Sequence, residues 1–441
     1  MLSVIGNAWA LLLGMMFLMV GNGMQGTMMG VRGALEGFST FDLSLITSAY
    51  FLGFLGGSRL APDFIGRVGH VRVFAALGSM VSAAVILYPA ITHAWAWVLL
   101  RIVVGFCFSG IYVTAESWLN NSATNETRGQ TLSLYMIVQM MGIVTAQGLL
   151  NVADPGGWLL FVIPSVLVSI SFAPILLSVA PTPAFETTKN MSLRELYGQS
   201  PLGFVGMFLL GSIFAAQFGM SAVYATQIGL SVAEISVFIS SIFVGAMVLQ
   251  YPIGFLSDRQ DRRILIIGVS FMGALAATIG WVFSDSFIAL CVAAFVLGGM
   301  SNPLYALLIA YTNDYLDPDD MAAASGGFIF INGLGAVGGP LLIGWIMSNF
   351  GANGFWLVII VLMVSLGLYG LWRMTQRASL YADEAEDYEP VPYAPVTNAG
   401  MAIVADVAQD FYSEAEDTDA QEPAAETEIK GGGGDESRGN A

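Results

Sequence analysis

The sequence predicts an all-α membrane protein with twelve transmembrane helices in two pseudo-symmetric six-helix halves, followed by a disordered acidic tail. Three observations support this fold class: the composition, the twelve long apolar segments and an internal repeat. Hydrophobic residues make up 56% of the chain and charged residues 11%, whereas soluble proteins carry about 25% charged residues. Such a chain lacks the polar side chains that a water-facing surface needs, so we expect it to face lipid.

Twelve apolar segments are each long enough to cross a bilayer, which takes about 20 mostly apolar residues. They are residues 5–30, 41–62, 72–91, 95–119, 129–152, 156–180, 201–227, 232–255, 263–283, 286–312, 322–349 and 353–374. They lack the alternation of barrel strands, so we predict helices. No Lys/Arg-rich leader precedes the first segment, and we expect it to be a retained helix and not a signal peptide.

The longest connection inside the apolar part, residues 181–200, divides the segments into six and six. We therefore predict an N-terminal half at 1–180, a central cytoplasmic loop at 181–200 and a C-terminal half at 201–377. The rest of the chain, 378–441, is rich in Pro, Ala, Asp and Glu. It has too little apolar surface to offset its chain entropy, so we predict a disordered acidic tail. It either keeps the protein soluble or offers a site for a tail-binding protein.

The two halves repeat one another. A shift of 192 residues aligns Gln25 with Gln217, Gly53 with Gly245 and Arg67 with Arg259, and a shift of 193 aligns Gly105 with Gly298, Tyr112 with Tyr305 and Gln139 with Asn332. Parallel repeats related by an axis along the membrane normal are typical of transporters whose substrate binds between the halves. The repeat therefore favours a transporter over a channel or a single-pass receptor.

The basic residues predict the orientation. With the N-terminus inside, the inner loops hold eleven Lys/Arg and the outer loops hold only Arg32. Both termini are therefore predicted to be cytoplasmic.

The sequence argues against several other functions. It contains no glycine-rich phosphate-binding loop, so we do not expect an ATP-driven pump or another enzyme. Its two histidines, His70 and His93, and two cysteines, Cys107 and Cys291, lack metal-ligand spacing. We expect no metal, no other cofactor and no nucleic-acid partner.

One charged loop carries the most specific motif. The stretch 250–263, QYPIGFLSDRQDRR, places five charged residues among its last six, and its motif positions are Gly254, Asp258, Arg259, Arg262 and Arg263. This order resembles the signature loop of the major facilitator superfamily of secondary transporters, with Asp261 where glycine is usual. The resemblance covers residues 1–377 and implies a twelve-helix fold and alternating access. It also implies that the loop latches the cytoplasmic side.

The first half carries a degraded copy of this loop. Arg67 is kept, Asp63 lies nearby, and Gly66 stands where the second half has Asp258. In the superfamily, an acid near the inner end of the fourth helix joins the latch. Glu116 holds that place here, with Arg67 as its expected partner, and Asp314 is its counterpart for Arg259 or Arg262. Gating is favoured over substrate contact for both acids.

Arg101 opens a run that resembles the superfamily's fourth-helix motif, RIVVG with a second glycine at Gly110. A cation inside the membrane is costly unless it faces a cavity, a partner or an anion. We therefore expect a role in substrate binding or proton coupling. The alternative is an arginine that extends to the outer headgroups.

Polar residues on the helices that line the cavity in this superfamily are further substrate candidates. They are Asn22, Gln25, Tyr112, Gln139, Gln147, Gln217, Tyr224, Gln250, Asn302, Tyr305 and Asn332. Such groups also bridge helices structurally. The pairs Gln25/Gln217, Tyr112/Tyr305 and Gln139/Asn332 are favoured because the repeat places both members toward one axis.

The resemblance implies a gradient- or proton-coupled transporter of a small neutral or anionic solute in the bacterial inner membrane. We expect a monomer whose partners are that solute and membrane lipids. The superfamily's antiporter motif is absent, since 138–148 reads VQMMGIVTAQG without proline. Two alternatives remain: a transporter-like sensor that signals through the tail, and a lipid translocase.

Overall fold

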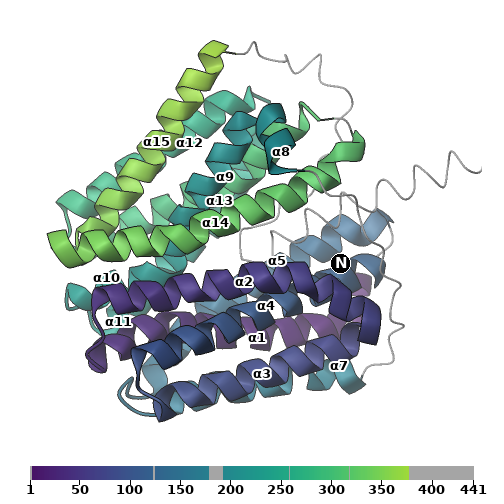
Figure 1. Ribbon diagram of the computed structural model, residues 1–441, viewed down its shortest axis with the longest axis vertical. Coiled ribbons are helices and arrows are strands. Elements are labelled where there is room, and N and C mark those ends of the chain that lie inside the picture. Colours follow the sequence, from purple (N-terminus) through teal and green to yellow (C-terminus); the bar gives the residue numbers. More distant parts are fainter. Residues whose placement is uncertain (1, 123–124, 178–191, 258, 317, 377–441) are drawn as a thin grey trace, which may run out of the picture.

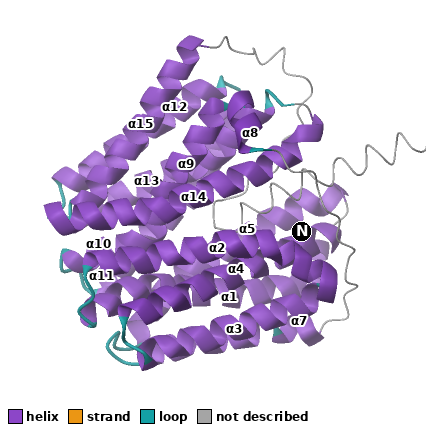
Figure 2. Cartoon of the chain, in the orientation of Figure 1, coloured by secondary structure: helices purple, strands orange, loops and turns teal. Residues whose placement is uncertain are grey.

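The computed structural model describes residues 2–122, 125–177, 192–257, 259–316 and 318–376. Within these ranges the chain folds into helices joined by short loops, and no strand occurs (Figure 2). The predicted acidic tail at 378–441 lies outside the described residues, as does the greater part of the predicted central loop.

The first part of the chain forms α1 (Leu2–Leu35), α2 (Thr40–Val68), α3 (His70–Ala90), α4 (Ala94–Ser122), α5 (Asn125–Leu149), η1 (Leu150–Val152), α6 (Leu159–Ser171) and α7 (Ala173–Leu177). The second part forms α8 (Leu193–Gln199), α9 (Pro201–Ala215), η2 (Ala216–Met220), α10 (Ser221–Gln227), α11 (Val232–Ser257), α12 (Arg262–Val282), α13 (Phe287–Asn313), α14 (Pro318–Phe350) and α15 (Gly354–Gln376). Each of the twelve predicted apolar segments is thus covered mainly by helix.

Eleven helical stretches in the described part are long and apolar enough to cross a membrane. The predicted segment 41–62 is helical as part of α2, but α2 is not among the eleven. Its buried residues include Ser, Thr and Gly, which lower its hydropathy while allowing neighbouring helices to approach closely.

Two local features differ from the prediction. The segment 156–180 contains two helices, α6 and α7, and the break at Phe172 precedes Pro174, which has no N–H to continue the helix. The predicted loop 181–200 contains the short helix α8. Ser192 and Glu195 cap its start reciprocally, a sequence signal that the loop prediction overlooked.

A π-helical turn, η2, joins α9 and α10 into one continuous helix over the predicted segment 201–227. Such turns widen a helix by one residue and change which side chains face a neighbour. Gln217 and Phe218 lie in this turn.

The helices form two groups that lie against each other (Figure 1). In the first group α2 packs on α4, α1 on α5, and α3 on α6. In the second, α11 packs on α13, α9 on α14, and α12 on α15. The groups meet where α2 packs on α14, α5 on α11, and α1 on α10.

The same glycine contacts recur in both groups. A Cβ atom on Gly53 would lie 2.0 Å from the main-chain oxygen of Ile102, and one on Gly105 would lie 1.9 Å from that of Tyr50. At positions shifted by 192 or 193 residues, a Cβ on Gly245 would lie 1.9 Å from the oxygen of Phe295, and one on Gly298 2.1 Å from that of Ile242. The pairs α2–α4 and α11–α13 therefore cross through equivalent glycines.

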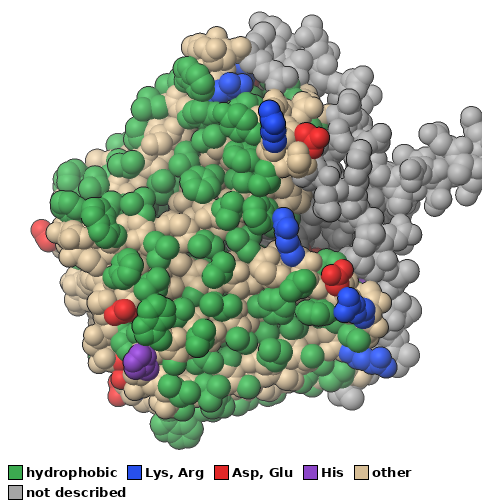
Figure 3. Space-filling model, viewed as in Figure 1, with side chains coloured by type: hydrophobic (Ala, Val, Ile, Leu, Met, Phe, Trp, Pro, Cys, Tyr) green, Lys and Arg blue, Asp and Glu red, His purple; other side chains and the backbone are tan. Residues whose placement is uncertain are grey.

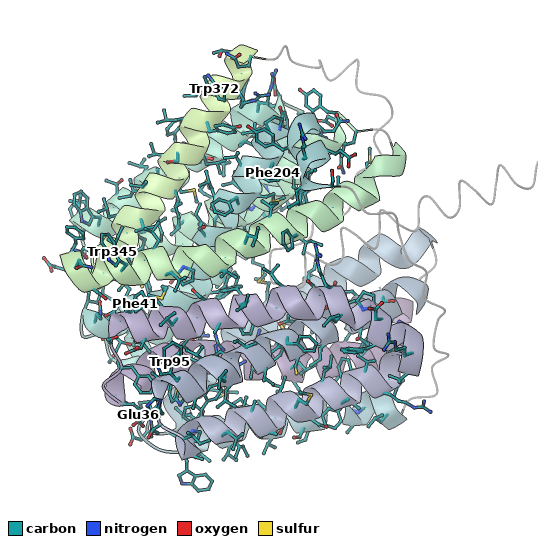
Figure 4. All side chains as sticks on the ribbon, in the orientation of Figure 1. Glu36, Phe41, Trp95, Phe204, Trp345 and Trp372 are labelled. Atoms are coloured by element: carbon teal, nitrogen blue, oxygen red, sulfur yellow. The ribbon has the colours of Figure 1, made fainter. Side chains whose placement is uncertain are left out.

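The outer surface suits a lipid environment. Hydrophobic side chains cover the middle of the visible face, and the charged side chains lie toward its edges (Figure 3). Trp95 and Trp345 lie near one end of the helices and Trp372 near the other, all exposed (Figure 4). Exposed tryptophans near both ends are typical of the membrane–water interfaces.

Candidate functional site

A cavity of about 60 Å³, the volume open to the centre of a water molecule, lies between the two groups of helices. This is room for a few waters. The first group supplies Asn22, Gly23, Gly26, Thr27, Thr47, Tyr50, Phe51, Arg101, Tyr112, Ile143 and Gln147. The second group supplies Phe218, Gly219, Ile239 and Phe243. The cavity therefore has one polar wall and one apolar wall.

Arg101 supplies the charge of the polar wall. Arg101 is buried, with 5% of the residue's surface exposed. Its Nη1 donates to Oε1 of Gln25 at 3.3 Å, and its guanidinium lies 4.6 Å from the centre of the Tyr50 ring. Its Nε has no hydrogen-bond partner in the described part of the chain. No carboxylate of the described residues forms an ion pair with it.

A chain of hydrogen bonds extends from Arg101 along α1. Gln25 accepts from Arg101 and donates through Nε2 to Oδ1 of Asn22 at 3.3 Å. Asn22 in turn donates through Nδ2 to the hydroxyl of Tyr112 at 2.9 Å. Because every link is neutral, this chain orients the arginine without cancelling its charge.

A second polar pair lies beside this chain. Thr27 donates to Oε1 of Gln147 at 3.0 Å, and Gln147 donates weakly to the main-chain oxygen of Gly23 at 3.5 Å. Both side chains are buried and line the cavity. They tie α1 to α5 at the level of the cavity.

The opposite wall is formed by aromatic and aliphatic side chains. Phe218, from the π-helical turn, packs against Phe243 of α11 with ring centres 5.3 Å apart. Ile239 lies one turn from Phe243 on the same helix, and Gly219 packs against Thr47 of the first group. This wall offers contact area and no charge.

The twelve substrate or coupling candidates divide into three sets: those that line the cavity, Gln25 beside Arg101, and those that do neither, among them the half-buried Gln250. Arg101, Asn22 and Tyr112 line the cavity, as does Gln147, and Gln25 contacts Arg101 directly. Gln139, Gln217, Tyr224, Asn302, Tyr305 and Asn332 are buried but do not line it. Of the six side chains in the three repeat-related pairs, Tyr112 is the one that lines the cavity in this structure.

Several second-half candidates form contacts between helices and do not line the cavity. Gln217 donates to Oγ of Ser301 at 2.8 Å and accepts from it at 3.1 Å, so η2 and α13 are bridged. Asn332 donates to the main-chain oxygen of Met207 at 3.1 Å. Tyr224 lies in an aromatic cluster with Phe355 and Trp356. These side chains have the helix-bridging role that was the alternative for each of them.

Sequence reasoning did not single out Thr27, Thr47, Tyr50, Phe51, Ile143, Phe218, Ile239 and Phe243 as cavity residues. Tyr50 follows a polar run, Thr47 and Ser48, on a helix that the repeat already placed near the axis. That run was the available signal. The apolar residues carried none, because they look like ordinary lipid-facing or core positions.

Within the described residues, the second copy of the charged loop forms two ion pairs. Arg262 donates to the carboxylate of Asp314, which joins the start of α12 to the end of α13. Arg263 pairs with Asp261 at 2.9 Å. Arg259 stacks on Phe255, and Gly254 is buried. Asp258 lies outside the described residues, so its part in a latch stays a prediction.

Burial and the neighbouring arginines shift the pKa values of these two carboxylates in opposite directions. Burial raises the pKa of Asp314, and the hydrogen bond and charge of Arg262 only partly oppose this. For Asp261, burial also acts to raise the pKa, but the hydrogen bonds and charge of Arg263 outweigh it, so the pKa is lowered.

In the first copy, the structure does not bring the predicted partners together. Arg67 and Asp63 are exposed, whereas Glu116 is buried and accepts a hydrogen bond from the hydroxyl of Tyr135 at 3.2 Å. Arg67 and Glu116 form no ion pair in the described part. Arg67 lies in the exposed last turn of α2, whereas Glu116 is buried on α4, so the two side chains do not meet.

The two groups of helices touch along one end of the molecule and its middle. Gln227 donates to Oγ1 of Thr40, Asn151 donates to Oγ of Ser236 at 3.2 Å, and Gly344 packs on Ser44. Toward the other end, Arg59 stacks on Phe330 at 4.7 Å. Beyond that contact, the groups diverge in the direction of α8 (Figure 1).

The described residues contain no group of three or more His, Cys, Asp or Glu side chains that could hold a metal ion. Nothing in the cavity is a nucleophile activated by a base. Its side chains can bind and orient a solute.

Comparison with known proteins agrees with this architecture. The family model described as Major Facilitator Superfamily matches residues 11–244 and 202–405. The uncharacterized MFS-type transporter YcaD of Escherichia fergusonii is 25% identical over 353 residues, 79% of this chain and 91% of that protein. YcaD of Escherichia coli O45:K1 is 26% identical over the same length.

Solved structures of transporters share the fold. The nucleoside transporter NupG superposes with a TM-score of 0.66 at 14% identity, over 83% of this chain and 98% of that chain. A bacterial homolog of the human lysosomal transporter Spinster, in an inward-facing and unoccupied conformation, gives a TM-score of 0.64 at 14% identity, over 91% and 97% of the two chains.

Proposed function

The chain belongs to the major facilitator superfamily, and from this premise we propose that it is a secondary active transporter that moves a small anionic solute across the bacterial inner membrane. Transport would use a proton or ion gradient and alternating access to the cavity between the two helix groups. The single observation that supports an anionic solute is the position of Arg101. It is a buried cation that lines the cavity and has no carboxylate partner in the described part.

An uncompensated buried charge is costly, and a cation inside a membrane protein faces a partner, an anion or water. The neighbours of Arg101 in the described part are neutral groups: the amide of Gln25, the ring of Tyr50 and the hydroxyl of Tyr88. A bound anion would supply the missing countercharge. A neutral solute, the other predicted class, would leave the charge uncompensated and is therefore less favoured.

The repeat supports two six-helix halves with α2 as the twelfth membrane helix. The crossings through Gly53 and Gly105 and through Gly245 and Gly298 are the same contact at positions shifted by 192 or 193 residues. Alternating access then requires that the halves seal the cavity at one end at a time. The contacts of Thr40, Ser44 and Asn151 with the second group would form the outer seal of an inward-facing state.

The orientation follows from the basic loops, with both termini in the cytoplasm. In that orientation the Trp95 end of the helices faces outward and the α8 end faces the cytoplasm.

The test is accumulation by purified protein in proteoliposomes. The vesicles are given a mixture of organic anions and neutral solutes under an imposed pH gradient or membrane potential, and their contents are measured by mass spectrometry. We expect at least one anion to accumulate and an uncoupler to abolish this. Arg101→Gln should remove the accumulation, while the matched variant Arg72→Gln, an exposed arginine at the start of α3, should keep it.

Two results would overturn the proposal. One is that no solute accumulates under any gradient. The other is that folded Arg101→Gln, verified by its melting curve, accumulates the same anions as the wild type.

A further inference from the structure

We infer that the solute is an amphipathic monoanion, with its one charged group at Arg101 and a compact apolar group against Phe218 and Phe243. This inference rests on the proposed transport function and specifies its substrate class. It follows from the chemistry of the two cavity walls, which come from different helix groups.

The polar wall can hold one anionic group. The Nε of Arg101 is buried without a partner in the described residues, Nη1 makes a long bond to Gln25 at 3.3 Å, and the other polar group beside the guanidinium in the described part is the hydroxyl of Tyr88. A carboxylate or sulfonate satisfies such donors well, because two of its oxygens match the planar guanidinium. A buried donor left unsatisfied is costly, so this position favours an oxygen ligand.

The apolar wall excludes a second charge. Among the described residues of the second helix group, only Phe218, Gly219, Ile239 and Phe243 line the cavity, and none of these four offers a polar side chain. A second charged group or a row of hydroxyls on the solute would be buried against Phe rings without partners. Dianions and sugar-like solutes therefore fit this cavity poorly.

The repeat explains why the charge is on one side only. The position equivalent to Arg101 in the second half is Ala294, which is buried and cannot bind an anion. Gln217, equivalent to Gln25, is held by Ser301 in two hydrogen bonds. The second half therefore does not present its equivalent polar residues, Gln217 and Tyr305, to the cavity, and Phe218 beside Gln217 faces the cavity instead.

Alkyl sulfonates test this inference, because they stay ionised and do not cross lipid as neutral acids. Binding to the full-length protein in detergent is measured by thermal shift and calorimetry. We expect butanesulfonate to bind at least about 10-fold more tightly than methanesulfonate, since three further CH₂ groups become buried. Butanesulfonamide, which is neutral, and 1,4-butanedisulfonate should each bind at least about 10-fold more weakly than butanesulfonate.

Two variants assign the preferences to the two walls. Phe243→Ala should reduce the butanesulfonate to methanesulfonate ratio at least about 3-fold and leave methanesulfonate affinity nearly unchanged. Arg101→Gln should remove the preference for sulfonate over sulfonamide. The inference is overturned if chain length has no effect, if the disulfonate binds best, or if Phe243→Ala changes nothing.

Failure of the inference and failure of the proposed function give different results. Arg101-dependent accumulation of hydrophilic anions that Phe243→Ala leaves intact would sink the inference and keep the transport function. Selective binding of butanesulfonate without gradient-driven uptake would sink the transport function and keep the amphipathic site.

Discussion

Gly105 brings α4 so close to α2 that a Cβ atom on it would lie 1.9 Å from the main-chain oxygen of Tyr50. The ring of the same tyrosine lies 4.6 Å from the guanidinium of Arg101. A packing glycine thus fixes the main chain of the residue whose ring covers the buried cation. Helix packing and the candidate site are coupled through this one contact.

Gly105→Ala should therefore destabilise the protein and weaken anion binding together. The methyl group meets main-chain atoms that cannot move without shifting α2, and overpacking of this kind costs about 1–3 kcal/mol. The control is Gly148→Ala on α5, where a Cβ would meet nothing within 4 Å. Thermal melts should show a lowered Tm for the first variant and an unchanged or slightly raised Tm for the second. Equal melting curves would contradict the close approach.

The crossings were predictable in part, because a repeat of glycines in apolar segments signals close helix contacts. Helix bounds were predicted well where capping residues or loops are polar, as for α11 at Val232–Ser257 against the predicted 232–255. The break before Pro174 and the helix α8 were missed, although their signals were in the sequence. The unequal fates of Gln25 and Gln217 were not predictable, since the partner of Gln217 is Ser301, which lies 84 residues away in the chain.

The pH dependence of stability should differ for Asp314 and Asp261. The pKa of Asp314 is raised in the folded state, mainly by burial, so the folded state binds this proton more readily than the unfolded state. Its contribution to stability therefore rises as pH falls through the folded pKa toward the unfolded value of about 3.9. Asp261 has a lowered pKa, so its contribution is present above about pH 3.9 and is lost as pH falls below that.

Melting curves between pH 7.5 and pH 2.5 check both signs. Relative to wild type, Asp314→Asn should lose the gain on acidification, and Asp261→Asn should lose less stability at the acid end. Identical pH profiles for the two variants would contradict the opposite shifts.

The proposed orientation predicts which exposed positions a membrane-impermeant thiol reagent reaches. In a variant with Cys107 and Cys291 replaced by Ala, Trp158→Cys should react in intact cells, because the loop between η1 and α6 is on the proposed outer side. Arg194→Cys, in α8, should react only with a permeant reagent. Both positions are exposed, so a difference reports sidedness and not burial. Labelling of Arg194→Cys from outside would reverse the orientation.

Cross-linking tests whether the seal must open during transport. Asn151 and Ser236 come from different helix groups and are joined by a 3.2 Å hydrogen bond. In the same cysteine-free background, Asn151→Cys with Ser236→Cys should be joined by a short bifunctional thiol reagent. Joining them should reduce uptake at least about 10-fold, and reductant should restore it. Each single variant, treated alike, is the control. Full uptake with the link in place would show that this contact does not open.

The charged loop predicts a cytoplasmic latch that has its acid in the second half only. One substitution can add the equivalent acid to the first half. Gly66 stands where the second half has Asp258, it is exposed, and a Cβ there would meet nothing within 4 Å. Gly66→Asp therefore adds a carboxylate without a steric clash. In the proposed latch this carboxylate meets the N-terminus of a helix from the other group, where a carboxylate contributes about 0.3–1 kcal/mol when exposed and up to about 2 kcal/mol when partly buried. If the latch exists only in the state closed to the cytoplasm, Gly66→Asp should favour that state, and Asp258→Asn should favour the inward-open one.

A change of about 1–2 kcal/mol shifts a two-state ratio roughly 5- to 30-fold. Spin labels on cysteines at Arg72 and Gln376, both exposed near the proposed cytoplasmic end, report the distance between the two groups. Gly66→Asn is the matched control, because it adds nearly the same volume without the charge. If Gly66→Asp and Gly66→Asn give the same distance distribution, the charge has no latching effect, and the loop serves only to anchor the topology.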